Sequence, residues 1–121
     1  MKILIIDDSP ASLALLSTYL IKWGYEVVAV ESCVDAWPLI SAGDIGLVLC
    51  DWEMPEMNGS ELCRQIARYA PVELTIFEQC EFNLYRIEQA LLKEWPNLSL
   101  NAVLGDVTDE AAVRHVVGAQ K

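Results

Sequence analysis

The sequence predicts an α/β protein in which helices cover both faces of a parallel sheet. Five short apolar segments recur along the 121 residues, and segments with helical spacing of their apolar residues separate them. Segments that are apolar at every position are typical of strands buried on both faces. A chain of this length is expected to bury one core, so residues 1–121 are predicted to form a single three-layer domain.

Each expected element has a local reason in the sequence. Aliphatic and valine-rich runs favour strands, whereas serine, proline and glycine mark helix ends. Ser9 and Pro10 are typical of an N-cap and a first helical residue, Gly24 of a C-terminal stop, and Thr108 is expected to cap the last helix. Pro38 lies inside the second expected helix and should kink or shorten it. The expected strands are 2–6, 26–30, 46–50, 72–77 and 98–104, and the expected helices are 10–23, 32–42, 60–69, 82–95 and 108–117.

Right-handed crossovers between parallel strands give these five units the flavodoxin-like strand order 2-1-3-4-5. In this order the first and third strands are neighbours, and they end at Asp7 with Asp8 and at Asp51 respectively. Because the carboxyl ends of parallel strands meet at one edge of the sheet, we expect the three carboxylates to cluster. Clustered carboxylates repel one another, and a hard divalent cation relieves that repulsion. The expected ion is Mg²⁺, bound weakly.

The composition excludes several classes of partner and location. The net charge is −10, with 8 basic residues scattered along the chain, so neither nucleic acid nor an anionic membrane is an expected partner. There is no signal peptide and no apolar run long enough to span a membrane. The four cysteines show no C-x-x-C spacing and are interpreted as reduced thiols. We therefore expect a cytoplasmic protein.

Two separated motifs identify a family that the first part of the chain resembles. Residues 5–9 (IIDDS) and 51–59 (DWEMPEMNG) are similar to the receiver domain of two-component response regulators, and the resemblance extends over residues 1–71. It implies that Asp51 accepts a phosphoryl group from a histidine kinase. It also implies that Mg²⁺ is held by Asp7, Asp8, Asp51 and the backbone carbonyl of Glu53.

The second part of the chain departs from that family. Receivers carry Ser or Thr at the end of the fourth strand, which bonds a phosphoryl oxygen, and Lys at the end of the fifth, which neutralises its charge. This chain has residues 77–79 (FEQ) and 105–107 (GDV) at those places. Both positions that stabilise the phosphoryl group are therefore expected to be acids.

Residues 73–117 instead resemble a Rossmann segment of nucleotide-sugar 4,6-dehydratases from polysaccharide biosynthesis. The resemblance rests on Phe77-Glu78, on residues 81–88 (EFNLYRIE) and on residues 103–109 (VLGDVTD). It implies that Glu78 would hold the cofactor ribose and that Asp106 and Val107 would lie against adenine. No G-x-G-x-x-G pyrophosphate loop and no Tyr-x-x-x-Lys pair occur, so we expect these positions to be vestigial and NAD not to bind.

Three functional hypotheses follow from the two resemblances. The first is an engineered or recombined chimera of a receiver-like half (1–71) and a Rossmann dehydratase-like half (72–121), which retains the cation site. Such a chimera would be no enzyme, would have no dedicated activity and would require no partner. The alternative is a divergent receiver that a histidine kinase phosphorylates on Asp51. The third is a nucleotide-binding Rossmann fragment.

Overall fold

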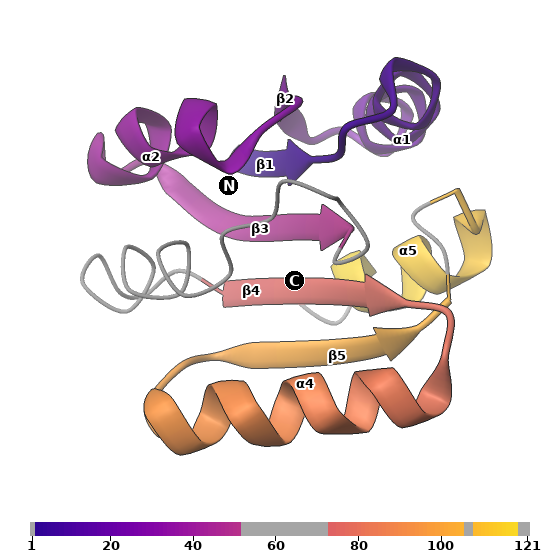
Figure 1. Ribbon diagram of the computed structural model, residues 1–121. Coiled ribbons are helices and arrows are strands. Elements are labelled where there is room, and N and C mark those ends of the chain that lie inside the picture. The colour runs from indigo at the N-terminus through magenta and orange to yellow at the C-terminus, as the bar shows by residue number, and fades with distance from the viewer. Residues whose placement is uncertain (1, 52–72, 106–107, 119–121) are drawn as a thin grey trace.

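The computed structural model describes residues 2–51, 73–105 and 108–118 (Figure 1). The helix expected over 60–69 lies outside these residues. In chain order the elements are β1 (Lys2–Ile6), α1 (Pro10–Lys22), β2 (Glu26–Val30), α2 (Cys33–Ser41), β3 (Ile45–Asp51), β4 (Glu73–Glu78), α4 (Glu81–Glu94), β5 (Leu100–Leu104) and α5 (Glu110–Gly118). The alternation of strands and helices is therefore the one that the apolar pattern predicts.

The sheet has five strands in the order β2-β1-β3-β4-β5, and every neighbouring pair is parallel. The predicted flavodoxin-like order is confirmed. In Figure 1 the arrowheads of β1, β3, β4 and β5 point the same way, so their carboxyl ends lie at one edge. Ile6 is paired with Cys50, and Asp51 with Phe77. The residues that follow β1 therefore lie beside the end of β3.

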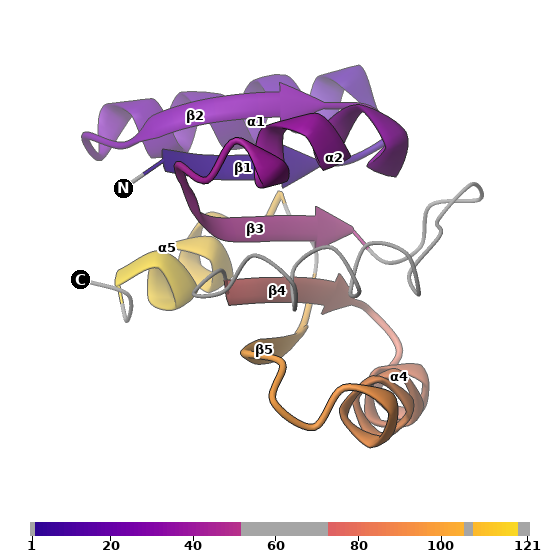
Figure 2. The same ribbon diagram turned by 90° about the vertical axis from the view of Figure 1, so that its left-hand side faces the viewer.

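Helices lie on both faces of the sheet (Figure 2), and the core consists of two apolar layers, one on each face. Side chains alternate along a strand, so neighbouring residues of β1 point into different layers. On one face, α2 and α4 cover Leu4, Ile6, Val48, Cys50, Leu74 and Ile76. On the other face, α1 and α5 cover Ile3, Ile5, Leu47, Leu49 and Phe77. The central strands β1, β3 and β4 are thus buried on both faces, as apolar strands predict, whereas the edge strands β2 and β5 are partly exposed.

The ends of α1 and α2 follow the sequence signals. The Ser9 hydroxyl accepts a hydrogen bond from the Ser12 amide at 3.3 Å, and Gly24 adopts a φ of 93°, a conformation that glycine allows after a helix. Helix α2 continues through Pro38 as far as Ser41, and the Ala42 amide donates to the Pro38 carbonyl at 3.1 Å. Pro38 removes its own donor without ending the helix.

Two elements begin two residues later than predicted, whereas several other boundaries shift by one residue. The cap of α5 is Asp109 and not Thr108, because the Asp109 carboxylate accepts a hydrogen bond from the Ala112 amide at 3.2 Å, and helical bonding starts from the Asp109 carbonyl. Strand β5 begins at Leu100 and not at Leu98, because the Leu98 amide is engaged in a turn with the Trp95 carbonyl at 3.0 Å. Leu98 is nevertheless buried in the core.

Candidate acidic site at the carboxyl ends of β1 and β3

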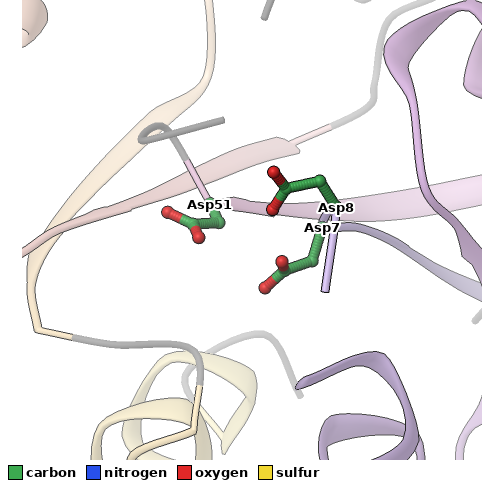
Figure 3. Close-up of side chains that lie close together, drawn as sticks. All are labelled: Asp7, Asp8 and Asp51. Carbon is green, nitrogen blue, oxygen red and sulfur yellow. The ribbon is translucent and has the colours of Figure 1, made fainter. Parts of the chain in front are cut away.

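Three carboxylates meet where β1 and β3 end. Asp7 and Asp8 follow β1, and Asp51 is the last residue of β3. One carboxylate oxygen from each residue lies within 4.8 Å of those of the other two (Figure 3). Asp7 is buried, Asp51 is half-buried and Asp8 is exposed. The predicted cluster is therefore present, and it opens to solvent on the side of Asp8.

Asp7 is held in place by two hydrogen bonds, one from its backbone amide and one to its carboxylate. Its amide donates to the Val30 carbonyl of β2 at 3.2 Å, and its Oδ1 accepts from the Ser9 amide at 2.9 Å. The residue is 2% exposed, and its Oδ2 has no hydrogen-bond partner among the described residues. A buried carboxylate oxygen without a partner is costly, because it has lost water and gained nothing in return.

The environment of Asp7 favours its protonated form. Burial is the largest cause, and with the negative charges of Asp51 and Asp8 it raises the pKa of Asp7 from 3.8 to about 6. The hydrogen bond from the Ser9 amide acts in the opposite direction. A cation bound here would stabilise the ionised form of Asp7, because a nearby positive charge favours a carboxylate over a carboxylic acid.

The donor set fits a hard divalent ion. Mg²⁺ prefers oxygen ligands and keeps several waters, and the site supplies three carboxylates with an exposed side at Asp8. The unpartnered Oδ2 of Asp7 is a buried atom that a cation would satisfy. Glu53, whose backbone carbonyl the receiver resemblance adds to the ligands, lies outside the described residues, as do Asp106 and Val107.

Glu78, the acid at the end of β4, is placed differently. It is 4% exposed, and its Oε1 accepts a hydrogen bond from the Cys80 amide at 3.1 Å. It does not belong to the group of carboxylates formed by Asp7, Asp8 and Asp51 in the described part of the chain. The sequence argument missed this bond, although Asp7-x-Ser9 and Glu78-x-Cys80 share the same spacing and offered a signal.

The described helices give no sign of a membrane segment. None of them is both long and apolar enough to cross a bilayer.

Comparisons with known proteins agree with the motifs of both halves. The family model of the response regulator receiver domain matches residues 3–78, and that of a polysaccharide biosynthesis protein matches residues 57–121. A chemotaxis protein CheY homolog of Campylobacter jejuni is 37% identical over 68 residues, which are 54% of this chain and 52% of that protein. Chemotaxis protein CheY1 of Helicobacter pylori is 38% identical over 68 residues, with 54% and 55% covered. The chain therefore spans about half the length of these curated relatives.

Solved structures extend the likeness over the whole fold. The response regulator TrrA of Thermotoga maritima, in complex with Mg(2+)-BeF, superposes with a TM-score of 0.73 at 26% identity, covering 99% of this chain and 98% of that one. Residues 3–78 make up more than half of the chain, and they contain all three acids of the cluster. The chain belongs to the family of response regulator receiver domains, and its second half also matches the polysaccharide biosynthesis family.

Proposed function

We propose that the chain is a divergent receiver domain that takes up a phosphoryl group on Asp51 with the help of Mg²⁺. The observation that carries this proposal is the meeting of Asp7, Asp8 and Asp51, with one buried oxygen of Asp7 left without a partner. The family match over residues 3–78 supports the same function. The comparisons favour it over a chimera without activity.

Asp51 would act as the nucleophile. One carboxylate oxygen attacks the phosphorus of the donor, a new O–P bond forms, and the donor's bond to phosphorus breaks with its electron pair leaving on the donor. The nucleophile is the carboxylate form of Asp51, so the step removes no proton from it. Asp7, Asp8 and the Glu53 carbonyl would hold the Mg²⁺ ion together with Asp51, and the ion would offset charge on the transferred group.

The same sequence predicts that this reaction is slow. The hydroxyl and the lysine that stabilise a phosphoryl group in receivers are replaced by Glu78 and Asp106. Each lost charge-assisted hydrogen bond forfeits roughly 1.5–3 kcal/mol, which corresponds to about one to two powers of ten. We therefore expect acyl phosphate to accumulate over hours with a small phosphodonor.

The proposed partner is a histidine kinase, and the proposed location is the cytoplasm, where such kinases present their phosphoryl group. TrrA of Thermotoga maritima, which shares the fold, was solved with Mg(2+)-BeF, and this supports Mg²⁺ as the ion. No partner beyond the kinase is required for the transfer itself.

The chimera hypothesis and the nucleotide-binding hypothesis have less support. The match to residues 57–121 supports a composite origin, in which residues 1–71 and 72–121 are two halves of a single domain. A nucleotide-binding function is weakened, because the buried Glu78 carboxylate already bonds the Cys80 amide and would have to leave it to bind ribose hydroxyls. We do not expect NAD to bind.

Intact mass spectrometry tests the proposal. The chain is incubated with acetyl phosphate and Mg²⁺, and the wild type should slowly gain the mass of one phosphoryl group. Asp51→Asn is the matched control, because it keeps the shape of the residue and removes the nucleophile. Equal mass gain in the two proteins, or none in the wild type after prolonged incubation, would contradict phosphorylation at Asp51.

A further inference from the structure

In the described part of the chain two acidic side chains are almost completely buried, those of Asp7 and Glu78. Burying a carboxylate costs several kcal/mol in general unless charges or hydrogen bonds replace the lost water. Among the described residues no basic side chain forms an ion pair with Glu78, and the ion pair found there joins Lys2 to Asp44 at the opposite edge. Within the described part of the chain, the hydrogen bond that compensates Glu78 comes from the backbone.

The backbone that compensates it is the start of α4. Cys80 is the N-cap residue of α4, and its own side chain makes no capping hydrogen bond. The Glu78 Oε1 accepts from the Cys80 amide at 3.1 Å, and the Cys80 carbonyl accepts the first helical bond from Leu84 at 2.9 Å. A negative charge beside a helix N-terminus is also favoured by the helix dipole. Glu78 thus secures the residue on which the helix begins.

The backbone of Glu78 reaches a third element. Its carbonyl accepts a hydrogen bond from the Gly105 amide at 3.0 Å, directly after the end of β5. One residue consequently connects the end of β4, the N-cap residue of α4 and the residue after β5. All three points lie at the edge of the sheet that holds the acidic site.

We propose that Glu78 is a positioning residue, which fixes the β4–α4 junction through its bond to the Cys80 amide and does not serve as a ligand of the acidic site. Glu78 occupies the position at which receivers carry a hydroxyl residue for the phosphoryl group. In this chain the side chain is committed to its own helix. The part of the inference that concerns metal binding rests on the proposed function, whereas the part that concerns α4 does not.

Hydrogen exchange measured residue by residue tests the first part on the full chain without metal. Glu78→Ala should speed exchange of the Cys80 and Leu84 amides roughly fivefold, the usual effect of losing a capping acceptor. Glu78→Gln should change the rates less than about twofold, since its amide oxygen still accepts. Glu81→Gln is the matched control, because it removes a negative charge from the exposed first turn of α4 and leaves the Cys80 amide bond intact.

Equal exchange in Glu78→Ala and the wild type would overturn the inference, and so would exchange in Glu78→Gln that is as fast as in Glu78→Ala. If the alanine variant does not fold, Glu78→Gln carries the test alone. Its Cys80 amide proton should then move upfield, because a neutral acceptor replaces a carboxylate, while Glu81→Gln leaves that signal in place.

Titration with Mg²⁺ tests the second part. Glu78→Gln should bind Mg²⁺ within about twofold of the wild type, whereas Asp8→Asn should bind it at least several-fold more weakly. A change of more than about fivefold in Glu78→Gln would show that Glu78 acts within the acidic site and would overturn this part. If the wild type itself bound no Mg²⁺, the metal site of the proposed function would fail, and the exchange experiment would still decide the role of Glu78.

Discussion

The junctions β1–α1 and β4–α4 share one local device and differ in what surrounds it. At each junction a buried acid lies at or directly after the end of the strand, and its carboxylate accepts a hydrogen bond from the backbone amide two residues later. Asp7 accepts from Ser9, and Glu78 accepts from Cys80. In both cases that later residue is the helix N-cap. Of these two acids, only Asp7 has a second oxygen that is fully buried without a hydrogen-bond partner, and only Asp7 lies in a cluster with two other carboxylates.

The strand order explains the difference. The sheet runs β2-β1-β3-β4-β5, so the chain leaves β1 in one direction for β2 and later returns to pair β3 on its other side. Ligand crevices form at such a switch point, outside the carboxyl ends of the strands. Asp7 follows β1 directly and so lies at this switch point. Strand β4, in contrast, lies between β3 and β5, away from the switch point. The same local hydrogen bond therefore lies within the acidic cluster at one junction, where we propose a cation site, and at the other junction it fixes, as we propose, the start of a helix.

The largest expected effect is the loss of the metal response in Asp51→Asn. Removing one of three carboxylates from a weak, mostly hydrated site should lower Mg²⁺ affinity more than tenfold. Tryptophan fluorescence can report binding, because Trp52 follows Asp51 directly in the sequence. The comparison of junctions sharpens this test: Glu78→Gln, which also removes one acid, should keep the response. Similar losses in both variants would mean that the two junctions are equivalent.

Asp7→Asn should stabilise the metal-free chain while it weakens Mg²⁺ binding. Asparagine can still accept the Ser9 bond, and it removes a buried negative charge from beside Asp8 and Asp51. We expect the free energy of unfolding at neutral pH to rise by about 1–2 kcal/mol, a gain of the kind seen when a strained functional site is relaxed. Urea denaturation without metal measures it, and a destabilised variant would argue against repulsion in the cluster.

Much of this arrangement could be predicted from the sequence, because it depends on patterns that tertiary structure seldom overrides. Strands that are apolar throughout require helices on both faces, and parallel order then places Asp7 next to Asp51. The predicted metal roles of these residues remain predictions. What could not be predicted is which oxygen of each acid finds a partner. That depends on the loop after each strand.

The starts of α5, α4 and β5 were hard to predict for the same reason. Thr108 and Asp109 are adjacent and both are good caps, so the path of the chain into α5 decides between them, and Asp109 reaches the Ala112 amide. Cys80 is a poor cap by type, and nothing in its own side chain marks it as the start of α4. Leu98 has strand-like neighbours, but a turn after Trp95 engages its amide. In each case a local hydrogen bond, between residues two or three apart, and not residue propensity, marks where the element begins.

The stability of the chain should depend on pH through Asp7. The folded pKa is raised to about 6, whereas an unfolded aspartate titrates near 4. Between these values the folded state keeps a proton that the unfolded state has lost, so the stability that is fully present below about pH 4 is lost as pH rises through about 6. Because Asp7→Asn lacks this titration, its advantage over the wild type in urea should be small at pH 4 and reach its maximum above pH 6. A difference independent of pH would exclude this cause.

Ser9→Ala should lower the free energy of unfolding by about 1 kcal/mol, which is the usual effect of losing a serine N-cap. The Ser9 hydroxyl accepts from the Ser12 amide, and alanine leaves that amide without its acceptor. The Ser9 amide, which donates to Asp7, is kept in the variant, so Mg²⁺ affinity should change little. Thermal or chemical denaturation together with a metal titration measures both. A large loss of Mg²⁺ affinity would show that the cap also orients the acidic site.

The smallest expected effect is a gain at the other junction. In Cys80→Ser a hydroxyl replaces an exposed thiol at an N-cap that makes no side-chain bond, and the extended backbone there, with φ −98° and ψ 117°, suits a capping serine. The new hydroxyl should accept from the amide of Asn83, three residues later, and raise the free energy of unfolding by about 0.5 kcal/mol. Cys80→Ala is the control and should be close to neutral, because Cys80 contributes no capping bond to lose. If the serine variant were no more stable than the alanine variant, the carboxylate of Glu78 would already satisfy the start of α4 completely. The two junctions would then differ less in how their helices are capped than in the carboxylates that lie beside each acid.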